Sequence, residues 1–248
     1  KSLETYNPIH HDGLAHIYGQ ELGVAANVYQ ALNRLLLGET RRSHQHALEA
    51  EKKAWKSGHI NTICYLHGHL LIGAIVANDM AAVEHHTTKL EPIVTEHNLH
   101  IWLSWAKLAS YLIKASRGDS SGSAEFMQDI TEMVASKNRI FSPIIQTAAG
   151  MEALKFDLVD QASDLADMAE EMIARTGEVV AAPQVFRLKA AIAKASGDGE
   201  ATQQYLETSL EIAKKQGAKL WELRASVDLA RLMQEQERTD EAIAILKP

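Results

Sequence analysis

Twelve histidines lie within the first hundred residues, and imidazole is the side chain that most often binds metals and transfers protons. Their spacing argues against a metal site, because His44/His46 and His67/His69 are two residues apart and point to nearly opposite faces of a helix. Cys64 and His67 share a helix face, but a zinc site needs three or four ligands. We therefore expect no metal and no cofactor. Because imidazoles ordinarily titrate at about pH 6.5, we expect the charge of this half to depend on pH.

Four carboxylates follow one another at spacings of four, three and four residues, which places them on one helix face: Asp160, Asp164, Asp167 and Glu171. Hard cations need several oxygen ligands that converge from a loop, and a straight helix rarely provides them. We interpret this stripe as a solvated face. Cys64 lies in an apolar stretch, which predicts a thiol buried in the core rather than a nucleophile.

Motifs that build catalytic sites are missing from the sequence. Neither G-x-x-x-x-G-K-[ST] nor G-x-G-x-x-G occurs, so no loop is expected to cradle phosphates. G-x-S-x-G and H-E-x-x-H are absent too, which removes the common hydrolase and metalloprotease signatures. We expect no catalytic residues and no enzyme activity in this chain. A stand-alone metalloenzyme built on the histidine-rich half remains an alternative that the spacing disfavours.

The composition of the chain restricts its expected cellular compartment and its expected binding partners. The 248 residues carry a net charge of -7, which gives the chain no attraction for nucleic acid. Cys64 is the single cysteine, so no intrachain disulfide forms and a reducing, cytoplasmic location is expected. The longest apolar run, 70–77, is too short to span a bilayer, and no membrane partner is expected. Because the sequence starts at Lys1 and stops at Pro248 after a short helical segment, we expect a fragment of a longer protein.

Turn-forming residues recur along the chain in two ladders with intervals of 39 or 40 residues. Glycine and asparagine accept the left-handed conformation that ends helices, and aspartate competes for the helix backbone. The first ladder consists of Gly58, Asn98, Asn138, Gly177 and Gly217. The second ladder, offset by twenty residues, consists of Gly38, Asn78, Gly118, Asp157 and Gly197.

Between the turns, apolar residues recur at spacings of three and four, which predicts helices. Two helices per period predict an all-α fold, an α-solenoid with a right-handed superhelix of about six helical hairpins. Residues 1–20 form a lead-in, and the repeat domain spans 21–248 with a truncated last hairpin. The six predicted hairpins cover 22–57, 59–97, 99–137, 140–176, 180–216 and 218–247.

Small residues occupy matching positions in several hairpins, because neighbouring helices approach too closely there for large side chains. They are Ala31, Ser43 and Ala50, then Gly150, Ala162 and Ala169, then Ala190, Thr202 and Ser209, then Ala230 and Ala242. Gly150 is informative, since a mid-helix glycine costs about 1 kcal/mol relative to alanine unless a close contact needs it. This pattern resembles the tetratricopeptide repeat (TPR), and residues 239–242 (TDEA) are typical of the start of a TPR second helix.

Segments near both ends carry a closer resemblance: 18–24 (YGQELGV), 35–38 (LLLG), 58–59 (GH), 211–218 (EIAKKQGA), 220–225 (LWELRA) and 229–232 (LARL). They resemble the C-terminal TPR region of bacterial signalling proteins with a class III adenylate/guanylate cyclase domain and an ATPase domain. The chain departs from that family at Leu22, where proline is usual, and at 39–42, which lacks the aromatic–proline turn.

This resemblance implies a non-catalytic interaction or regulatory segment of a cyclic-nucleotide signalling protein. Its partner would be another protein or peptide, or the parent's own ATPase and cyclase domains. Similar repeats occur in ATPase-linked, STAND-type transcription regulators, so a sensor arm of such a regulator is the alternative. The apolar face of a truncated last hairpin makes a homodimer a further candidate.

TPR stacks bind ligands on a groove lined by the first helix of each hairpin. Counting from the small residues gives the groove positions of the fifth and sixth hairpins: Gln184, Arg187, Lys194, Arg224, Arg231 and Gln234. Four of these six side chains are basic, which predicts a locally basic groove that suits an acidic peptide or a terminal carboxylate. The alternative is that they are ordinary solvated side chains.

Overall fold

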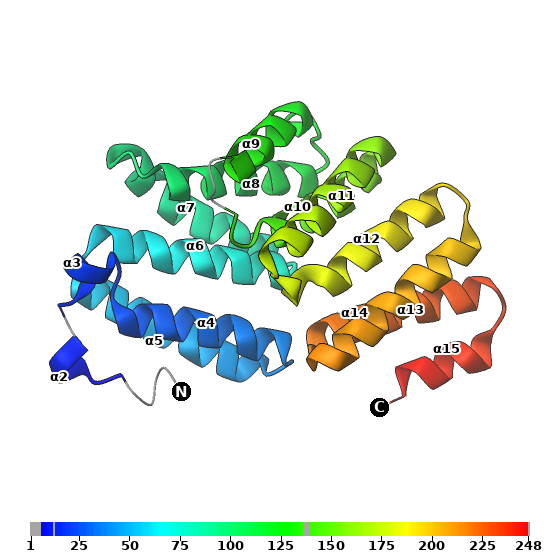
Figure 1. Ribbon diagram of the computed structural model, residues 1–248, viewed down its shortest axis with the longest axis horizontal. Helices are drawn as coiled ribbons and strands as arrows, with labels where there is room; N and C mark the ends of the chain where they lie inside the picture. Colours follow the sequence, from blue (N-terminus) through cyan, green and yellow to red (C-terminus); the bar gives the residue numbers. More distant parts are fainter. Residues whose placement is uncertain (1–5, 12, 136–138, 248) are drawn as a thin grey trace. The chain divides into compact units, whose positions relative to one another are not determined.

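The computed structural model describes residues 6–11, 13–135 and 139–247, and within these ranges the regular structure is entirely helical (Figure 1). The all-α class and the arrangement in TPR-like hairpins are confirmed. The chain divides into two compact units, Lys1–Asn138 and Arg139–Pro248. Whether the repeats over 21–248 act as one domain stays a prediction.

Within its described residues, unit 1 contains two short lead-in helices and three antiparallel hairpins. The lead-in helices are α2 (Pro8–His11) and α3 (Ala15–Tyr18). The hairpins are α4 (Leu22–Leu36) with α5 (Thr40–Ser57), α6 (Ile60–Ala77) with α7 (Met80–Glu96), and α8 (His100–Ser116) with α9 (Ser123–Ala135).

Unit 2 also contains three hairpins, two of which include a short 3-10 turn. They are α10 (Ser142–Ala153) and η1 (Leu154–Phe156) with α11 (Val159–Thr176), η2 (Val179–Ala181) and α12 (Ala182–Ala195) with α13 (Gly199–Gln216), and α14 (Lys219–Glu235) with α15 (Thr239–Leu246).

The two turn ladders set these boundaries. Nine of the ten ladder residues have φ between +53° and +87°, and the tenth, Asn138, lies outside the described residues. Glu237 also has a positive φ, 61°, forty residues after Gly197, and it ends the first helix of the last hairpin. The sequence rule missed Glu237 because glutamate is not a residue that favours this conformation.

Side chains at the helix starts satisfy backbone N–H groups that the helix itself leaves unpaired. Asp79 accepts a hydrogen bond from the Ala82 N–H at 3.0 Å, and Asp198 accepts one from the Ala201 N–H at 2.9 Å. At Leu22 the buried Glu21 carboxylate caps α4 by accepting from the Val24 N–H at 2.6 Å. This cap explains how α4 begins without a proline at its first position.

Several of the predicted small residues lie at close contacts between helices. Ser43 Oγ donates to the Ala31 carbonyl at 2.7 Å across the first hairpin. Ser209 Oγ is buried and donates to the Pro183 carbonyl at 2.7 Å across the fifth. Gly150 faces Leu188 so closely that an added Cβ would lie 2.5 Å from Leu188 Cδ2.

Contacts between successive hairpins repeat at the same sequence interval in both units. Trp102 Nε1 donates to Asn61 Oδ1 at 2.8 Å, and Trp221 Nε1 donates to the Val180 carbonyl at 3.1 Å. Each pair is 41 residues apart, which is one period plus one residue. Each hydrogen bond joins the start of one hairpin's first helix to the next hairpin's first helix, so the contact fixes their register.

Helix α6 is the most apolar element of unit 1, and it is the one helix of the described ranges with the length and composition of a membrane span. However, 67% of that span is buried inside the fold. Cys64 belongs to this buried set, as predicted, and desolvation raises the pKa of its thiol to about 11. The buried core helix of a folded domain can have the same length and apolar composition as a membrane span, and α6 is mostly buried.

The Gly150 contact predicts a stability change. Gly150→Leu should lower the free energy of unfolding by about 1–3 kcal/mol, because the new side chain meets Leu188. Gly73→Ala in α6 is the control, since an added Cβ there meets nothing within 4 Å. It should instead stabilise by up to about 1 kcal/mol through helix propensity. Urea denaturation measures both, and equal effects of the two changes would contradict the contact.

Candidate binding face of unit 2

The six predicted groove residues divide equally between α12 and α14, the first helices of the fifth and sixth hairpins. We call this surface the α12–α14 face and define it by those residues: Gln184, Arg187, Lys194, Arg224, Arg231 and Gln234. Two ion pairs connect the helices across it, so the structure brings the predicted positions together. Their role as a ligand site stays a prediction.

Arg187 is the most tightly held side chain of the face. Its Nε and Nη2 donate to Asp228 Oδ2 at 2.8 and 2.5 Å, and its Nη1 donates to Gln184 Oε1 at 2.7 Å. The side chain of Arg187 is only 12% exposed, so solvent screens this pair weakly. Arg187 therefore fixes the register of α12 against α14 and has little capacity left for a ligand.

Lys194 and Glu235 form the second link, with Nζ 2.7 and 2.6 Å from the two carboxylate oxygens. Both side chains are more than half exposed, so this pair contributes little to stability. Asp228 and Glu235 offset the charges of Arg187 and Lys194. The face is consequently less basic than its six predicted residues suggest.

Sequence reasoning missed both acidic partners, although a signal existed. Asp228 follows Arg187 by 41 residues, and Glu235 follows Lys194 by 41. The same interval separates the tryptophan contacts between hairpins. A search for opposite charges one period plus one residue apart would have found both pairs.

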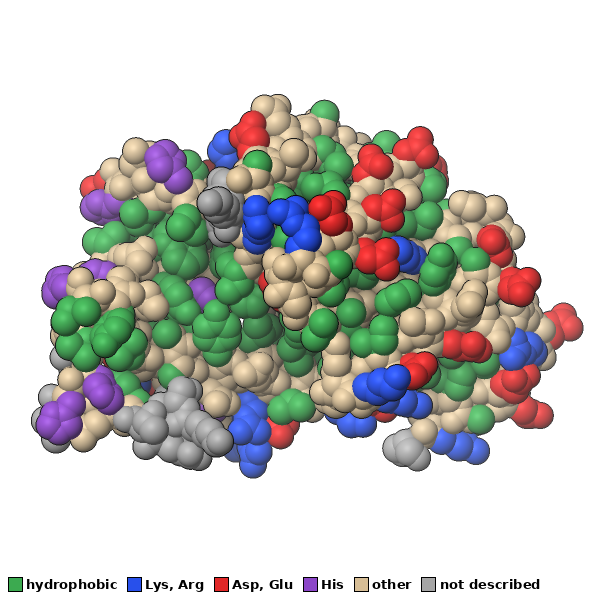
Figure 2. Space-filling view, viewed as in Figure 1, with side chains coloured by type: hydrophobic (Ala, Val, Ile, Leu, Met, Phe, Trp, Pro, Cys, Tyr) green, Lys and Arg blue, Asp and Glu red, His purple; other side chains and the backbone are tan. Residues whose placement is uncertain are grey.

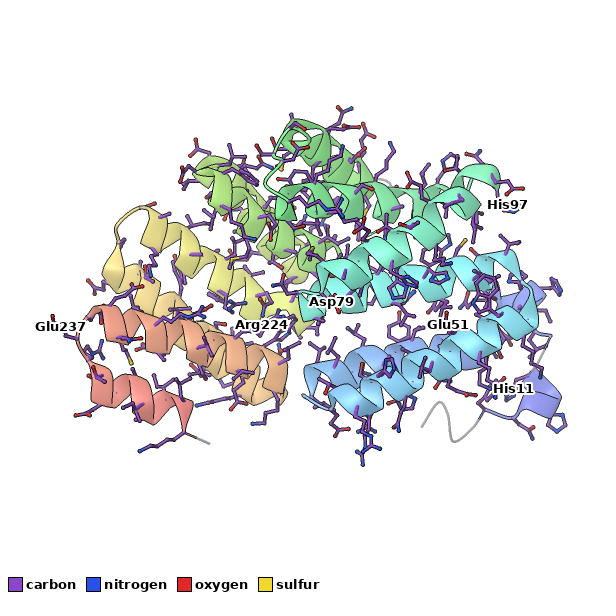
Figure 3. All side chains as sticks on the ribbon, turned by 180° about the vertical axis from the view of Figure 1, so that it is seen from behind. His11, Glu51, Asp79, His97, Arg224 and Glu237 are labelled. Carbon is purple, nitrogen blue, oxygen red and sulfur yellow. The ribbon has the colours of Figure 1, made fainter. Side chains whose placement is uncertain are left out.

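Arg224 differs from Arg187 and Lys194, which are both ion-paired. Its guanidinium lies over the Trp221 ring at 5.2 Å from the centroid, and it has no ion pair or hydrogen-bond partner in the part of the chain that is described. Burial lowers the pKa of Arg224 to about 10, and neighbouring Arg187 adds to this, while Asp228 opposes it. Arg224 stays charged at neutral pH, and it is labelled in Figure 3.

A second unused donor lies on the same face. Gln184 is 8% exposed, and its buried Nε2 has no hydrogen-bond partner among the described residues. Arg231 is 71% exposed and reaches Asp228 Oδ1 only at 3.7 Å, and Gln234 is exposed as well. The face therefore combines a half-buried cation, a buried amide donor and a solvent-exposed rim.

The histidines of unit 1 build a different arrangement. His67 on α6 and His86 on α7 share a hydrogen bond, with their Nδ1 atoms 3.2 Å apart. The His69 ring, also on α6, stacks on Tyr65 with centroids 3.9 Å apart. Burial lowers the pKa of all three imidazoles to about 4. The expectation that the histidines titrate near neutrality is therefore wrong for these three.

No group of three or more potential ligands that could hold a metal occurs in the ranges the structure describes. The acidic stripe on α11 is exposed along its whole length, in agreement with its interpretation as a solvated face. Figure 2 shows acidic side chains gathered over the region of α11 and the histidines over unit 1.

Comparison with known proteins supports the assignment of these helical hairpins to the tetratricopeptide repeat class. The tetratricopeptide repeat family matches residues 181–247, which contain α12 to α15 and thus the whole α12–α14 face. The chain therefore carries a tetratricopeptide repeat region, a type of module that generally mediates protein–protein interaction. No curated protein and no solved structure matches the chain significantly.

The buried imidazoles predict an acid-sensitive unit 1. Their pKa of about 4 lies below the ordinary value of 6.5, so the unfolded chain binds more protons between these two pH values. The free energy that the neutral imidazoles contribute to folding is fully present above pH 6.5 and is lost as the pH falls toward 4. The loss is at most about 1.4 kcal/mol per pH unit for each imidazole.

Melting curves between pH 7.5 and 5 measure this loss. The double variant His67→Leu/His86→Leu should show a shallower pH dependence, whereas the exposed His97→Gln control should keep that of the parent chain. An unchanged slope in the double variant would contradict the assignment.

Proposed function

We propose that the chain is a non-catalytic protein-interaction segment that binds an acidic peptide or a terminal carboxylate on the α12–α14 face. The observation that carries this proposal is the half-buried Arg224 guanidinium, which forms no ion pair or hydrogen bond among the described residues. The neighbouring anion, Asp228, is already paired with Arg187 and offsets the charge of Arg224 only in part. A partly desolvated cation with so little compensation is unfavourable, and a carboxylate ligand relieves that cost.

The neighbouring side chains suit the same ligand. A guanidinium binds a carboxylate through two parallel hydrogen bonds, which are stronger than neutral ones. Arg231 supplies further positive charge at the exposed rim. Arg187 acts as a positioning residue, because its hydrogen bonds to Asp228 hold α12 against α14 beside Arg224.

The parent protein that we propose is a cytoplasmic bacterial signalling protein with a class III adenylate/guanylate cyclase domain and an ATPase domain. The resemblance of segments such as 18–24 and 220–225 supports it. The repeats would bind a partner, or the parent's own ATPase domain, and shift it between two conformations by differential affinity. Reading the codons upstream of Lys1 tests this, and absence of both enzymatic domains there removes it. The isolated chain should turn over neither ATP nor GTP.

The second candidate is the sensor arm of a STAND-type, ATPase-linked transcription regulator, which uses similar repeats. The same gene reading separates the two candidates, because a regulator should encode a helix-turn-helix DNA-binding domain. Binding by the α12–α14 face is compatible with both parents, so it is tested separately.

Fluorescence anisotropy with labelled hexapeptides that end in Asp or Glu tests the face directly. Arg224→Gln should weaken binding by about tenfold or more, since it removes a charge-assisted contact. Arg175→Gln on α11 is the matched control, because it removes the same charge from an exposed position of unit 2 outside the face. It should change the affinity less than about twofold.

Peptides with an amidated C-terminus distinguish a terminal carboxylate from acidic side chains. Loss of binding on amidation indicates that the terminus is the ligand group, whereas retained binding assigns that role to the side chains. Equal weakening by Arg224→Gln and Arg175→Gln would contradict the proposed site. Absence of binding by every peptide, in free-acid and amide forms, would contradict the proposed ligand class.

A further inference from the structure

Unit 1 contains a pocket of about 380 Å³ between its first two hairpins. Residues of α4, α5, α6 and α7 and the turn before α7 line it. Pockets for small organic ligands begin at about 300 Å³, so this space is large enough for one. None of the features assigned to the α12–α14 face uses it.

Small side chains create this space. Ala31, Ala47, Gly73 and Ala77 are among the lining residues, and leucines from α4, α5 and α6 complete the apolar wall. A Cβ added at Gly73 would meet nothing within 4 Å, although this glycine lies inside α6. A mid-helix glycine costs about 1 kcal/mol relative to alanine, and here no close helix contact accounts for it. The apolar lining beside Gly73 therefore leaves room for a small ligand.

The charges of the pocket have one sign. Glu51 and Asp79 are the charged lining residues, and the lining contains neither lysine nor arginine. Asp79 uses one carboxylate oxygen to cap α7, whereas the half-buried Glu51 has no ion pair or hydrogen bond within the described ranges. Figure 3 labels both residues, Glu51 on α5 and Asp79 in the turn before α7.

Three histidines also line the pocket: the exposed His44 and the more buried His69 and His86. Burial lowers the pKa of the His69 and His86 imidazoles to about 4, so these two are neutral at pH 7 and do not balance the carboxylates. His86 is held in place by its hydrogen bond to His67. The pocket thus pairs an apolar wall with an unbalanced negative charge.

We propose that this pocket binds a small organic cation, a primary amine with an aliphatic body, whose ammonium group pairs with Glu51. The body fills the space beside Gly73 and replaces water against the aliphatic wall. A partly buried carboxylate gains more from a cation than an exposed one does, because solvent screens the pair less. The ligand touches both hairpins and therefore stabilises unit 1 by mass action.

Titration of the whole chain with three six-carbon probes tests this: n-hexylammonium, 1-hexanol and hexanoate. Isothermal titration calorimetry and changes in the backbone amide chemical shifts, measured by NMR, serve as readouts. Hexylammonium should bind with Kd of about 1 mM or tighter. Hexanoate should bind at least about tenfold more weakly, because its charge repels Glu51 and Asp79.

Three variants locate the binding. Gly73→Leu should abolish hexylammonium binding by filling the space. Glu51→Gln should weaken it at least about fivefold while leaving the helix intact. Glu49→Gln is the matched control, because it removes a carboxylate from the same helix outside this pocket, and it should have no effect. Thermal melts verify that each variant folds, and Glu51→Gln decides the question even where Gly73→Leu does not fold.

Several outcomes would overturn the proposal. These are the absence of hexylammonium binding, tighter binding of hexanoate, and hexanol binding equal to that of hexylammonium. Insensitivity of hexylammonium binding to Glu51→Gln would overturn it as well. Each of these results is independent of whether the α12–α14 face binds acidic peptides.

Discussion

Close approach of helices at small side chains is the constraint on which the rest of the structure depends. Ala50, Ala162, Ala169 and Ser209 have no exposed surface, and each lies in the second helix of its hairpin. A larger side chain at such a position would push the helices apart. Hairpins built in this way bury apolar surface only against their neighbours, which makes the fold a series of local contacts.

From this constraint follows the spacing of the polar contacts. Because successive first helices lie side by side, residues about one period apart come within hydrogen-bond distance. The Asn61–Trp102 contact in unit 1 and the Arg187–Asp228 pair in unit 2 span the same 41 residues. The interval that holds the hairpins together thus also decides which charges are neutralised and which, like Arg224, remain available. The register between α12 and α14 therefore determines which side chains of the α12–α14 face can bind a ligand.

Much of the fold could be predicted because its signals are local. Left-handed turn residues and small residues act within one hairpin, so the sequence displays them at fixed intervals. The electrostatics of the face is harder to predict, because Asp228 and Glu235 belong to the hairpin after that of Arg187 and Lys194. Its signal is therefore an interval of 41 residues between hairpins rather than a pattern within one hairpin. The pocket of unit 1 left no local signal, since Gly73 differs from Gly150 only in what the neighbouring helix places opposite it. Burial of His67 and His86 likewise depends on which residues of α6 and α7 meet.

A double-mutant cycle at Gly150 and Leu188 tests the constraint of close approach most directly. Gly150→Ala and Leu188→Ala are made singly and together, and urea denaturation gives the free energy of unfolding of each. If the two side chains compete for one space, Leu188→Ala should relieve the strain of Gly150→Ala, with a coupling energy of about 1 kcal/mol or more. Additive effects of the two substitutions would contradict the account, because they would mean that the helices do not meet at these positions.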